Sequence, residues 1–254
     1  MYWENMSGLA LGGFPSLEVM APAMEARFAS RLGGRSTGPF RWLNLGSGIG
    51  DDEAAVDDNR KLLLSALGLD PGAVALCRQV HGDRIEVVDS GGLYDSCDGL
   101  VTSRPGLSLV ISTADCFPVL IYSPPERVLA ALHVGREGAR KGIIGKAVRI
   151  LLERFDVDPS TLVAGTGPGI CEGCYEVGSE IAGRFPEDVS VEREGRYHLD
   201  LAGFCEREFT LAGIRRDRIF RANLCTSCSE DLCYSYRRDG GTTGRHWTVA
   251  AVRG

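Results

Sequence analysis

The chain has 254 residues, of which 44% are hydrophobic and 24% charged, so it is long and apolar enough to bury a sizeable core. Its 28 basic and 34 acidic residues give a formal net charge of −6, which excludes a general electrostatic nucleic-acid binder because such proteins need an excess of cations. No apolar run approaches the roughly eighteen residues of a membrane span, and the N-terminus lacks the basic lead of a secretory signal. We therefore expect a single cytoplasmic domain, residues 1–254, with no membrane or nucleic-acid partner.

The first 25 residues show no clear periodicity and are expected to be poorly defined, with ordered structure beginning near Arg27. Three later segments have the three-to-four spacing of apolar residues that is typical of amphipathic helices: 52–67, 139–155 and 201–212. Acidic residues load the first turn of the first of these helices, and Asp200 is placed to cap the last one.

Strand-like runs separate these helices and are expected at 74–80, 84–88, 107–112, 118–122, 127–133, 163–166 and 248–252. The His81-Gly82-Asp83 tripeptide is the expected tip of a hairpin between the first two runs, and residues 113–117 turn between the next two. Hairpins mixed with helices predict an α/β (α+β) class in which mixed β-sheets pack between helices.

Only four histidines occur, and two of them, His81 and His133, lie where a predicted strand ends, while Cys116 lies in a turn between strands. Two imidazoles and a thiolate suit Zn²⁺, and three protein ligands leave a fourth position open, which is the pattern of catalytic zinc. The spacing alone leaves the structural alternative open, because a single histidine at a strand end commonly makes only a hydrogen bond and a single cysteine commonly fills a core.

Eight sequence blocks, in order, carry a specific resemblance. They are RLGGRSTGPFRWLNLG (31–46), GDDEAAVDDNRKLL (50–63), QVHGDRI (79–85), STADCFPVLIYSP (112–124), ALHVGREG (131–138), GPGICEGCYEVG (167–178), YHLDL (197–201) and SYRRDGGTTGR (235–245). These blocks resemble the YfiH family of laccase-domain, or multicopper-polyphenol-oxidase-like, proteins, and the resemblance runs from about Arg27 to the C-terminus.

The resemblance implies a mixed α/β fold related to the catalytic domain of cytotoxic necrotizing factor toxins. It also implies a metal site at the positions of His81, Cys116 and His133, with zinc as the expected metal and copper as the alternative. Activities assigned within the family are purine nucleoside phosphorolysis, adenosine deamination, polyphenol oxidation and the editing of peptidoglycan precursors.

The chain departs from the family pattern HAGWRG, which here reads HVGREG (133–138). The usual tryptophan is Arg136 and the usual arginine is Glu137. An acid beside an anion site disfavours phosphate unless Arg136 supplies the missing charge. Together with Arg136, the candidate substrate-binding residues are Asn44 in the LNLG segment and Arg238 in the SYRRDGG segment.

Four functions follow from these residues. The first is a zinc enzyme acting on purine nucleosides, by phosphorolysis of adenosine, inosine or methylthioadenosine or by deamination of adenosine, with nucleoside and phosphate as partners. The second is a Cys–His hydrolase or amidase that edits peptidoglycan precursors with Cys116 as nucleophile. The third, a copper-dependent polyphenol oxidase, is disfavoured because such enzymes need several coppers and four histidines are too few. The fourth is a binding protein that has lost activity.

Nine cysteines occur, and four of them form two C-x-x-C pairs, Cys171 with Cys174 and Cys225 with Cys228. Zinc ribbons separate such pairs by roughly 15–20 residues. Here about 50 residues intervene, so we expect buried thiols rather than a second zinc.

Overall fold

The computed structural model describes residues 1–253. Within that range the helices are α1 (Pro15–Met20), α2 (Glu53–Ala66), α3 (Arg136–Arg140), α4 (Ile143–Phe155), α5 (Ser179–Ala182) and α6 (Leu201–Leu211). The strands are β1 (Tyr2–Met6), β2 (Leu9–Gly13), β3 (Met24–Ala29), β4 (Val74–Arg78), β5 (Ile85–Val87), β6 (Gly92–Asp95), β7 (Gly99–Thr102), β8 (Ser108–Thr113), β9 (Phe117–Ser123), β10 (Val128–Val134), β11 (Val163–Thr166), β12 (Glu176–Val177), β13 (Ser190–Arg193), β14 (Arg196–Leu199), β15 (Ile219–Arg221) and β16 (His246–Val252).

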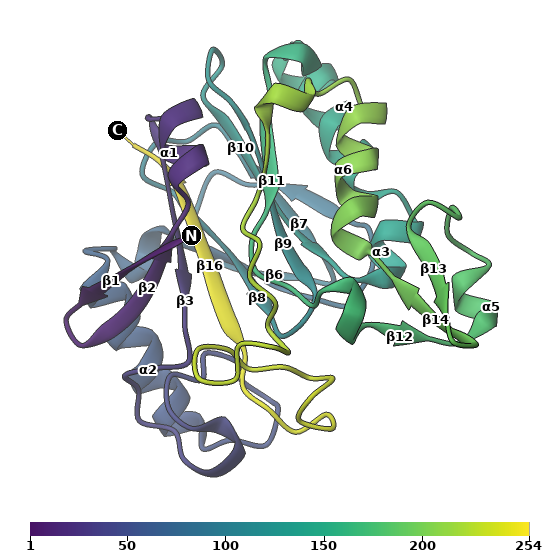
Figure 1. Cartoon of the computed structure of the whole chain (residues 1–254). Coiled ribbons are helices and arrows are strands. Elements are labelled where there is room, and N and C mark those ends of the chain that lie inside the picture. Colours follow the sequence, from purple (N-terminus) through teal and green to yellow (C-terminus); the bar gives the residue numbers. More distant parts are fainter. Residues whose placement is uncertain (254) are drawn as a thin grey trace.

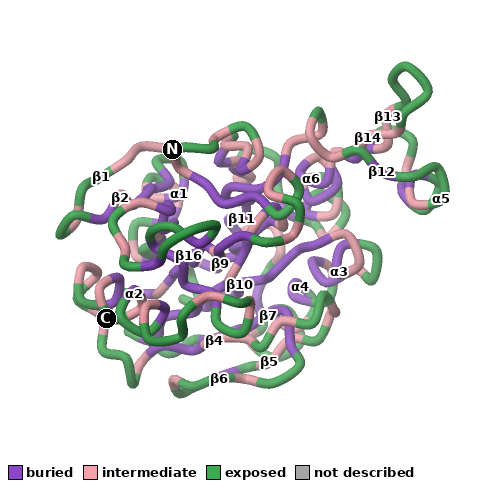
Figure 2. Tube along the Cα trace, turned by 90° about the horizontal axis from the view of Figure 1, so that it is seen from below, coloured by how far each residue is buried: buried purple, intermediate pink, exposed green. Residues whose placement is uncertain are grey.

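The strands form two large mixed sheets and one small sheet (Figure 1). The seven-stranded sheet has the order β1-β2-β3-β16-β8-β4-β6, and the six-stranded sheet has the order β15-β11-β9-β10-β7-β5. The small sheet, β12-β14-β13, projects from the side of the body together with α5 (Figure 2). The observed class is thus the mixed α/β class, with several mixed sheets, that the sequence predicts.

The two large sheets pack face to face through a shared apolar core, to which Leu109 and Ile111 of β8 and Leu120 and Tyr122 of β9 belong. Helices α4 and α6 cover the outer face of the six-stranded sheet (Figure 1). Leu63 and Leu64 of α2 join a separate apolar cluster with Val110 of β8, which places α2 on the other face of the seven-stranded sheet. The result is a helix–sheet–sheet–helix arrangement, and Figure 2 shows the buried residues concentrated at its centre.

Local sequence signals account for the helix boundaries. The side chain of Asp52 accepts a hydrogen bond from the Ala54 N–H and caps α2, and the side chain of Asp200 does the same for the Gly203 N–H in α6. The segment predicted as one helix at 139–155 is two helices, α3 and α4. Gly142 between them has a φ of 76°, in the left-handed region that glycine adopts without strain, so the helix is interrupted there.

Two expectations from the sequence are wrong. The first 25 residues are well defined, because β1 and β2 extend one edge of the seven-stranded sheet and β3 lies beside β16. The expected hairpins do not form either. Strands β4 and β5 lie in different sheets, and so do β8 and β9, so each of these connections crosses from one sheet to the other.

No helix among residues 1–253 combines the length and the apolar composition needed to cross a lipid bilayer.

Candidate metal centre

Three side chains converge where strands of the two large sheets end. His81 follows β4, Cys116 lies between β8 and β9, and His133 is in β10. One ligand atom from each residue lies within 4.8 Å of the other two. The imidazole rings of His81 and His133 meet edge to face, with centroids 4.8 Å apart. The structure therefore brings together the three residues that the sequence singles out as metal ligands.

The orientation of His133 is fixed by Asp98, a buried carboxylate that sequence reasoning missed. Asp98 Oδ1 lies 2.8 Å from His133 Nδ1, and the backbone N–H of His133 donates to the Asp98 carbonyl at 2.7 Å. An imidazole that gives its Nδ1 proton to a carboxylate presents Nε2 as a lone pair, which is the usual support for a metal-bound histidine.

The same carboxylate also holds the turn that carries His81. Asp98 Oδ1 accepts the N–H of His81 at 3.0 Å, and its Oδ2 accepts the N–H groups of Val80 and Gly82 at 3.2 and 2.7 Å. These bonds stabilise a turn in which His81 has a φ of 57°, an uncommon conformation for a residue with a Cβ. One side chain thus positions two of the three candidate ligands.

Gly135 allows the chain to pass close to the cluster. A Cβ at this position would lie 2.9 Å from Cys116 Sγ and 3.3 Å from His81 Cδ2, so any larger residue would displace both side chains. Gly135 has a φ of −90°, which residues with a side chain also adopt. The glycine is therefore required by the packing of the site and not by its backbone conformation.

The electrostatics favour a thiolate at Cys116 and, without a metal ion, a protonated ring at His133, so a metal ion must displace that proton when it binds. Burial opposes ionisation of Cys116, but the neighbouring imidazoles of His133 and His81 outweigh it and lower the pKa of the thiol to about 6. Burial likewise disfavours the charged form of His133, whereas Cys116 and Asp98 favour it and raise the pKa of His133 to about 9. A thiolate is thus present near neutrality, where a cation is its natural partner.

The donor set fits a divalent metal ion with an open coordination position. His133 is 3% exposed, Cys116 is half-buried and His81 is exposed, so the cluster opens to solvent on one side. Two imidazole nitrogens and one thiolate form a three-ligand set of the kind that catalytic zinc sites use, and a buried carboxylate supports one of the two histidines.

Asn44 and Arg238, expected to bind substrate, make hydrogen bonds within the protein. Asn44 is buried; its amide donates to Gly46 and Asp51 and accepts from Gly46 and Arg245. The five donors of the Arg238 guanidinium are directed at Asp239 and at the carbonyls of Thr226, Ser227 and Cys233. These contacts favour positioning roles for both residues.

Arg245 is the cation that the structure adds to the site. It precedes His246, which pairs with Thr113 where the turn that carries Cys116 begins. Burial lowers the pKa of Arg245, and the charges of Cys116 and Asp115 act in the opposite direction. Its Nη1 donates to the carbonyls of Thr243 and Gly244, while within residues 1–253 its Nε and Nη2 have no hydrogen-bond partner in the protein. Arg245 lies in the last family-like block, 235–245, together with Arg237 and Arg238. The sequence therefore offers three arginines there and no means of choosing Arg245 among them.

Arg136 and Glu137 lie at the start of α3, beside the cluster. Arg140 and Arg136 hold the pKa of the Glu137 carboxyl below its usual value, with hydrogen bonds of 3.1 and 3.4 Å to its two oxygens. Burial raises the pKa of the Tyr175 hydroxyl, and the charge of Arg136 acts in the opposite direction. Glu137 is thus paired with two cations, and its charge is partly neutralised.

The remaining titratable candidates are engaged elsewhere. The carboxylate of Asp115, the residue before Cys116, accepts from Thr226 Oγ1 and from the Arg237 N–H at 2.6 and 2.7 Å. His246 is buried between the Tyr234 N–H and the Ala29 carbonyl, and His198 contacts the Glu172 carbonyl. Only two of the four histidines therefore contribute to the cluster.

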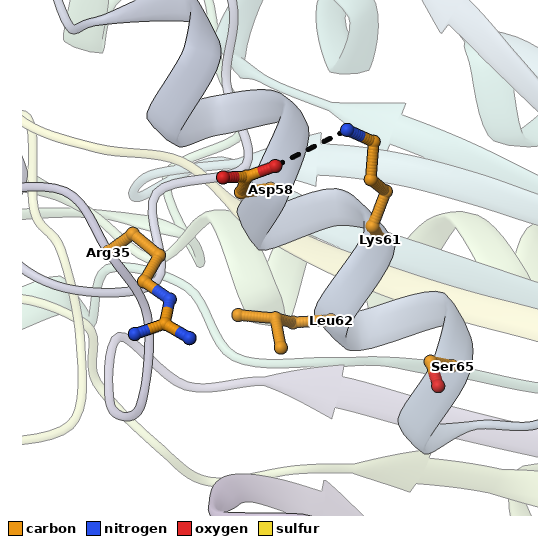
Figure 3. Close-up of a pocket in the computed structure, with 5 residues that line it drawn as sticks. All are labelled: Arg35, Asp58, Lys61, Leu62 and Ser65. Atoms are coloured by element: carbon orange, nitrogen blue, oxygen red, sulfur yellow. Dashed lines mark hydrogen bonds and ion pairs between the residues drawn. The ribbon is translucent and has the colours of Figure 1, made fainter.

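A shallow cavity of about 310 Å³ lies over α2 and contains none of these residues (Figure 3). Lys61 and Asp58, about one turn apart on α2, form an ion pair of 3.3 Å on the helix side of the cavity, and Arg35 lines it from a loop. With no buried polar group or metal-ligating cluster in its lining, this cavity offers no chemistry that competes with the His–Cys–His site.

Comparison with known proteins gives a family match over nearly the whole chain. The model of the family described as "Multi-copper polyphenol oxidoreductase laccase" matches residues 25–253. A protein of Deinococcus radiodurans named purine nucleoside phosphorylase is 38% identical over 244 residues, which cover 94% of each chain. A purine nucleoside phosphorylase of Streptomyces coelicolor is 40% identical over 225 residues, covering 86% of this chain and 91% of the relative.

Two solved structures have the same fold. YlmD from Geobacillus stearothermophilus superposes with a TM-score of 0.91 at 30% identity, covering 99% of this chain and 98% of that one. The protein YfiH of Bacillus licheniformis superposes with a TM-score of 0.90 at 29% identity, covering 99% of both chains.

Proposed function

Because the chain belongs to the multi-copper polyphenol oxidoreductase laccase family, which includes the YfiH-type proteins, we propose that it is a zinc-dependent purine nucleoside phosphorylase. The observation that carries this proposal is the convergence of His81, Cys116 and His133 on one open-sided cluster. The relatives named purine nucleoside phosphorylase supply the substrate class.

In this reaction a phosphate oxygen attacks the anomeric carbon of the ribose, the carbon–nitrogen bond to the purine breaks, and the purine leaves with a proton. A zinc ion held by the three ligands would polarise a bound oxygen and stabilise the charge that develops on it. Asp98 keeps the His133 ring in one tautomer, and the buried cluster excludes bulk water on its inner side.

Phosphate binding is assigned to Arg245 and Arg136. The unpartnered Nε and Nη2 of Arg245 form a fork that matches two phosphate oxygens. Arg136 stands where the family pattern has tryptophan, and it supplies a cation beside the cluster. Since Arg140 and Arg136 both pair with Glu137, that carboxylate repels a bound phosphate less than an isolated acid would.

Product analysis tests the reaction. The zinc-loaded protein is incubated with adenosine, with and without phosphate, and the products are separated by chromatography. Adenine and ribose 1-phosphate formed only with phosphate support the proposal. Inosine formed in both samples would instead identify deamination, and no product from protein that contains zinc at the cluster would reject both nucleoside reactions.

A Cys–His hydrolase is the second candidate, because Cys116, His133 and Asp98 also form a nucleophile–base–carboxylate series. Cys116 Sγ lies within 4.8 Å of a ring nitrogen of His133, and His133 Nδ1 bonds to Asp98 Oδ1. The two functions differ in their response to metal. A chelated protein that retains amidase activity on peptidoglycan precursors and loses it on alkylation of Cys116 would favour the hydrolase. Protection of Cys116 from alkylation by stoichiometric zinc favours the phosphorylase.

A further inference from the structure

A second set of metal-ligating side chains lies outside the His–Cys–His site. The sulfurs of Cys171, Cys174, Cys225 and Cys228 lie within 4.8 Å of one another. The sequence spacing predicts buried thiols here, but Cys171, Cys174 and Cys225 are half-buried and Cys228 is exposed. We propose that the four thiolates bind a structural zinc ion, a site that does not depend on the proposed activity.

The fold explains why pairs so far apart in sequence meet. Strands β11 and β15 are parallel neighbours, with Ala164 opposite Ile219, so the segments that leave them run side by side (Figure 1). The pairing continues past the strands, where the Thr226 N–H donates to the Gly169 carbonyl at 3.1 Å. Each C-x-x-C pair follows one of these strands, and the two pairs therefore arrive at the same place.

The compactness of the cluster fits a single ion. A tetrahedral zinc with bonds of about 2.3 Å to four sulfurs sets neighbouring sulfurs about 3.8 Å apart. The sulfurs of Cys174 and Cys228 are 3.4 Å apart, and no pair exceeds 4.8 Å, so small side-chain rotations complete the tetrahedron. A multi-iron cluster would hold the thiolates around a larger cage.

Backbone groups around the cluster favour thiolates. Cys225 Sγ accepts the N–H groups of Cys171 and Cys228 at 3.3 and 3.4 Å, so donors from both arms converge on one sulfur. Such bonds stabilise the deprotonated form that binds metal. Arg237 donates to the carbonyls of Cys174 and Glu176 at 3.5 and 2.8 Å, which brings a positive charge close to one arm of the cluster.

The cluster connects to the His–Cys–His site through Asp115, the residue before Cys116. The carbonyl of Asp115 accepts the Ile170 N–H at 2.9 Å, and its carboxylate accepts Thr226 Oγ1 at 2.6 Å. Ile170 and Thr226 are the immediate neighbours of Cys171 and Cys225. An ion that joins the two arms would therefore brace the turn that presents Cys116.

Zinc content tests this proposal on the full-length chain produced under reducing, zinc-replete conditions. Cys116→Ala, which removes a ligand of the first site, is expected to retain one tightly bound zinc. Cys174→Ser is expected to lose one zinc relative to the unaltered protein. Cys77→Ser, a half-buried thiol outside both clusters, is the matched control and is expected to lose none.

A second measurement covers the case in which Cys174→Ser does not fold. Cobalt substituted into Cys116→Ala is expected to give the intense visible absorption and the thiolate-to-cobalt charge-transfer bands of a tetrahedral tetrathiolate site. Zinc content that is unchanged in folded Cys174→Ser would overturn the proposal. Tightly bound iron in place of zinc would also overturn it. In protein never exposed to a chelator, two disulfides or four freely alkylated thiols at these positions would overturn it as well.

Discussion

At the scale of single residues, the sequence names the candidate ligands but not the residues that support them. His81, Cys116 and His133 stand out because their side chains have metal-binding chemistry and lie where strands end. Asp98 carries no such signal. It meets His133 because Gly99 of β7 pairs with Leu132 of β10, and this register places the preceding aspartate beside the following histidine. Contacts that depend on strand register are not visible in residue spacing.

Gly135→Ala is expected to weaken zinc binding about tenfold or more, because the added Cβ would lie 2.9 Å from Cys116 Sγ. Gly145→Ala is the matched control, since a Cβ there meets nothing within 4 Å and lies in α4. Competition with a chromophoric chelator measures both affinities. Equal zinc affinity in the two variants would show that the close approach of Gly135 is not needed.

Arg245→Ala is expected to raise the KM for phosphate and lower kcat/KM about 10- to 100-fold, because losing charge-assisted hydrogen bonds to phosphate costs roughly 1.5–3 kcal/mol. Arg245→Lys keeps the charge without the fork and should fall between. Arg215→Ala removes an exposed arginine paired with Asp217 and serves as control. Steady-state rates against phosphate concentration measure the effect, and an unchanged phosphate KM in Arg245→Ala would remove this residue from the phosphate site.

At the scale of elements, periodicity identifies helices and strands but not their partners. The sequence predicts α2, α6 and β11 nearly to the residue, since caps and apolar spacing are local signals. It does not separate β4 from β5 or β8 from β9 into different sheets, because a turn between two strands looks the same whether or not they pair. The parallel pairing of β11 and β15 is also hidden, and with it the meeting of the four cysteines.

Asp98→Asn tests how one residue joins elements of both sheets. The amide can still contact His133 but carries no charge and offers fewer acceptors to the turn at residues 80–82, so zinc affinity is expected to fall about 10- to 100-fold. Asp95→Asn is the matched control, because Asp95 is exposed and pairs with Arg78. Isothermal titration with zinc measures the difference, and wild-type affinity in Asp98→Asn would mean that the carboxylate does not support the ligands.

At the scale of the whole molecule, the two sheets share one core, and all the residues of the two cysteine-containing clusters except His133 of β10 lie in connections between strands. The ligands of the His–Cys–His site come from segments on both large sheets, whereas the four cysteines follow two strands of the six-stranded sheet, so both sites depend on the tertiary fold. The core itself contains His246, at the start of the central strand β16, and this buried group links stability to pH.

Burial lowers the pKa of His246 from 6.5 to about 3. The unfolded chain therefore binds a proton at this residue before the folded chain does, and stability is lost as the pH falls from about 6.5 to about 3. At pH 5 the free energy of unfolding is lower by about 2 kcal/mol than at neutral pH because of this residue. Urea unfolding at pH 7 and pH 5 should show a smaller pH-dependent loss in His246→Asn than in the unaltered protein. The same loss in both would contradict the assignment.

The most direct test of the central claim is the turnover of inosine with phosphate by three proteins whose zinc content is measured on the same samples. The unaltered protein and His198→Gln, which changes a histidine outside the cluster, are expected to bind zinc at the His–Cys–His site and to release hypoxanthine. His133→Gln is expected to lose that zinc and the activity together. Hypoxanthine release at the unaltered rate by His133→Gln would contradict the account, because the reaction would then not occur at this metal centre.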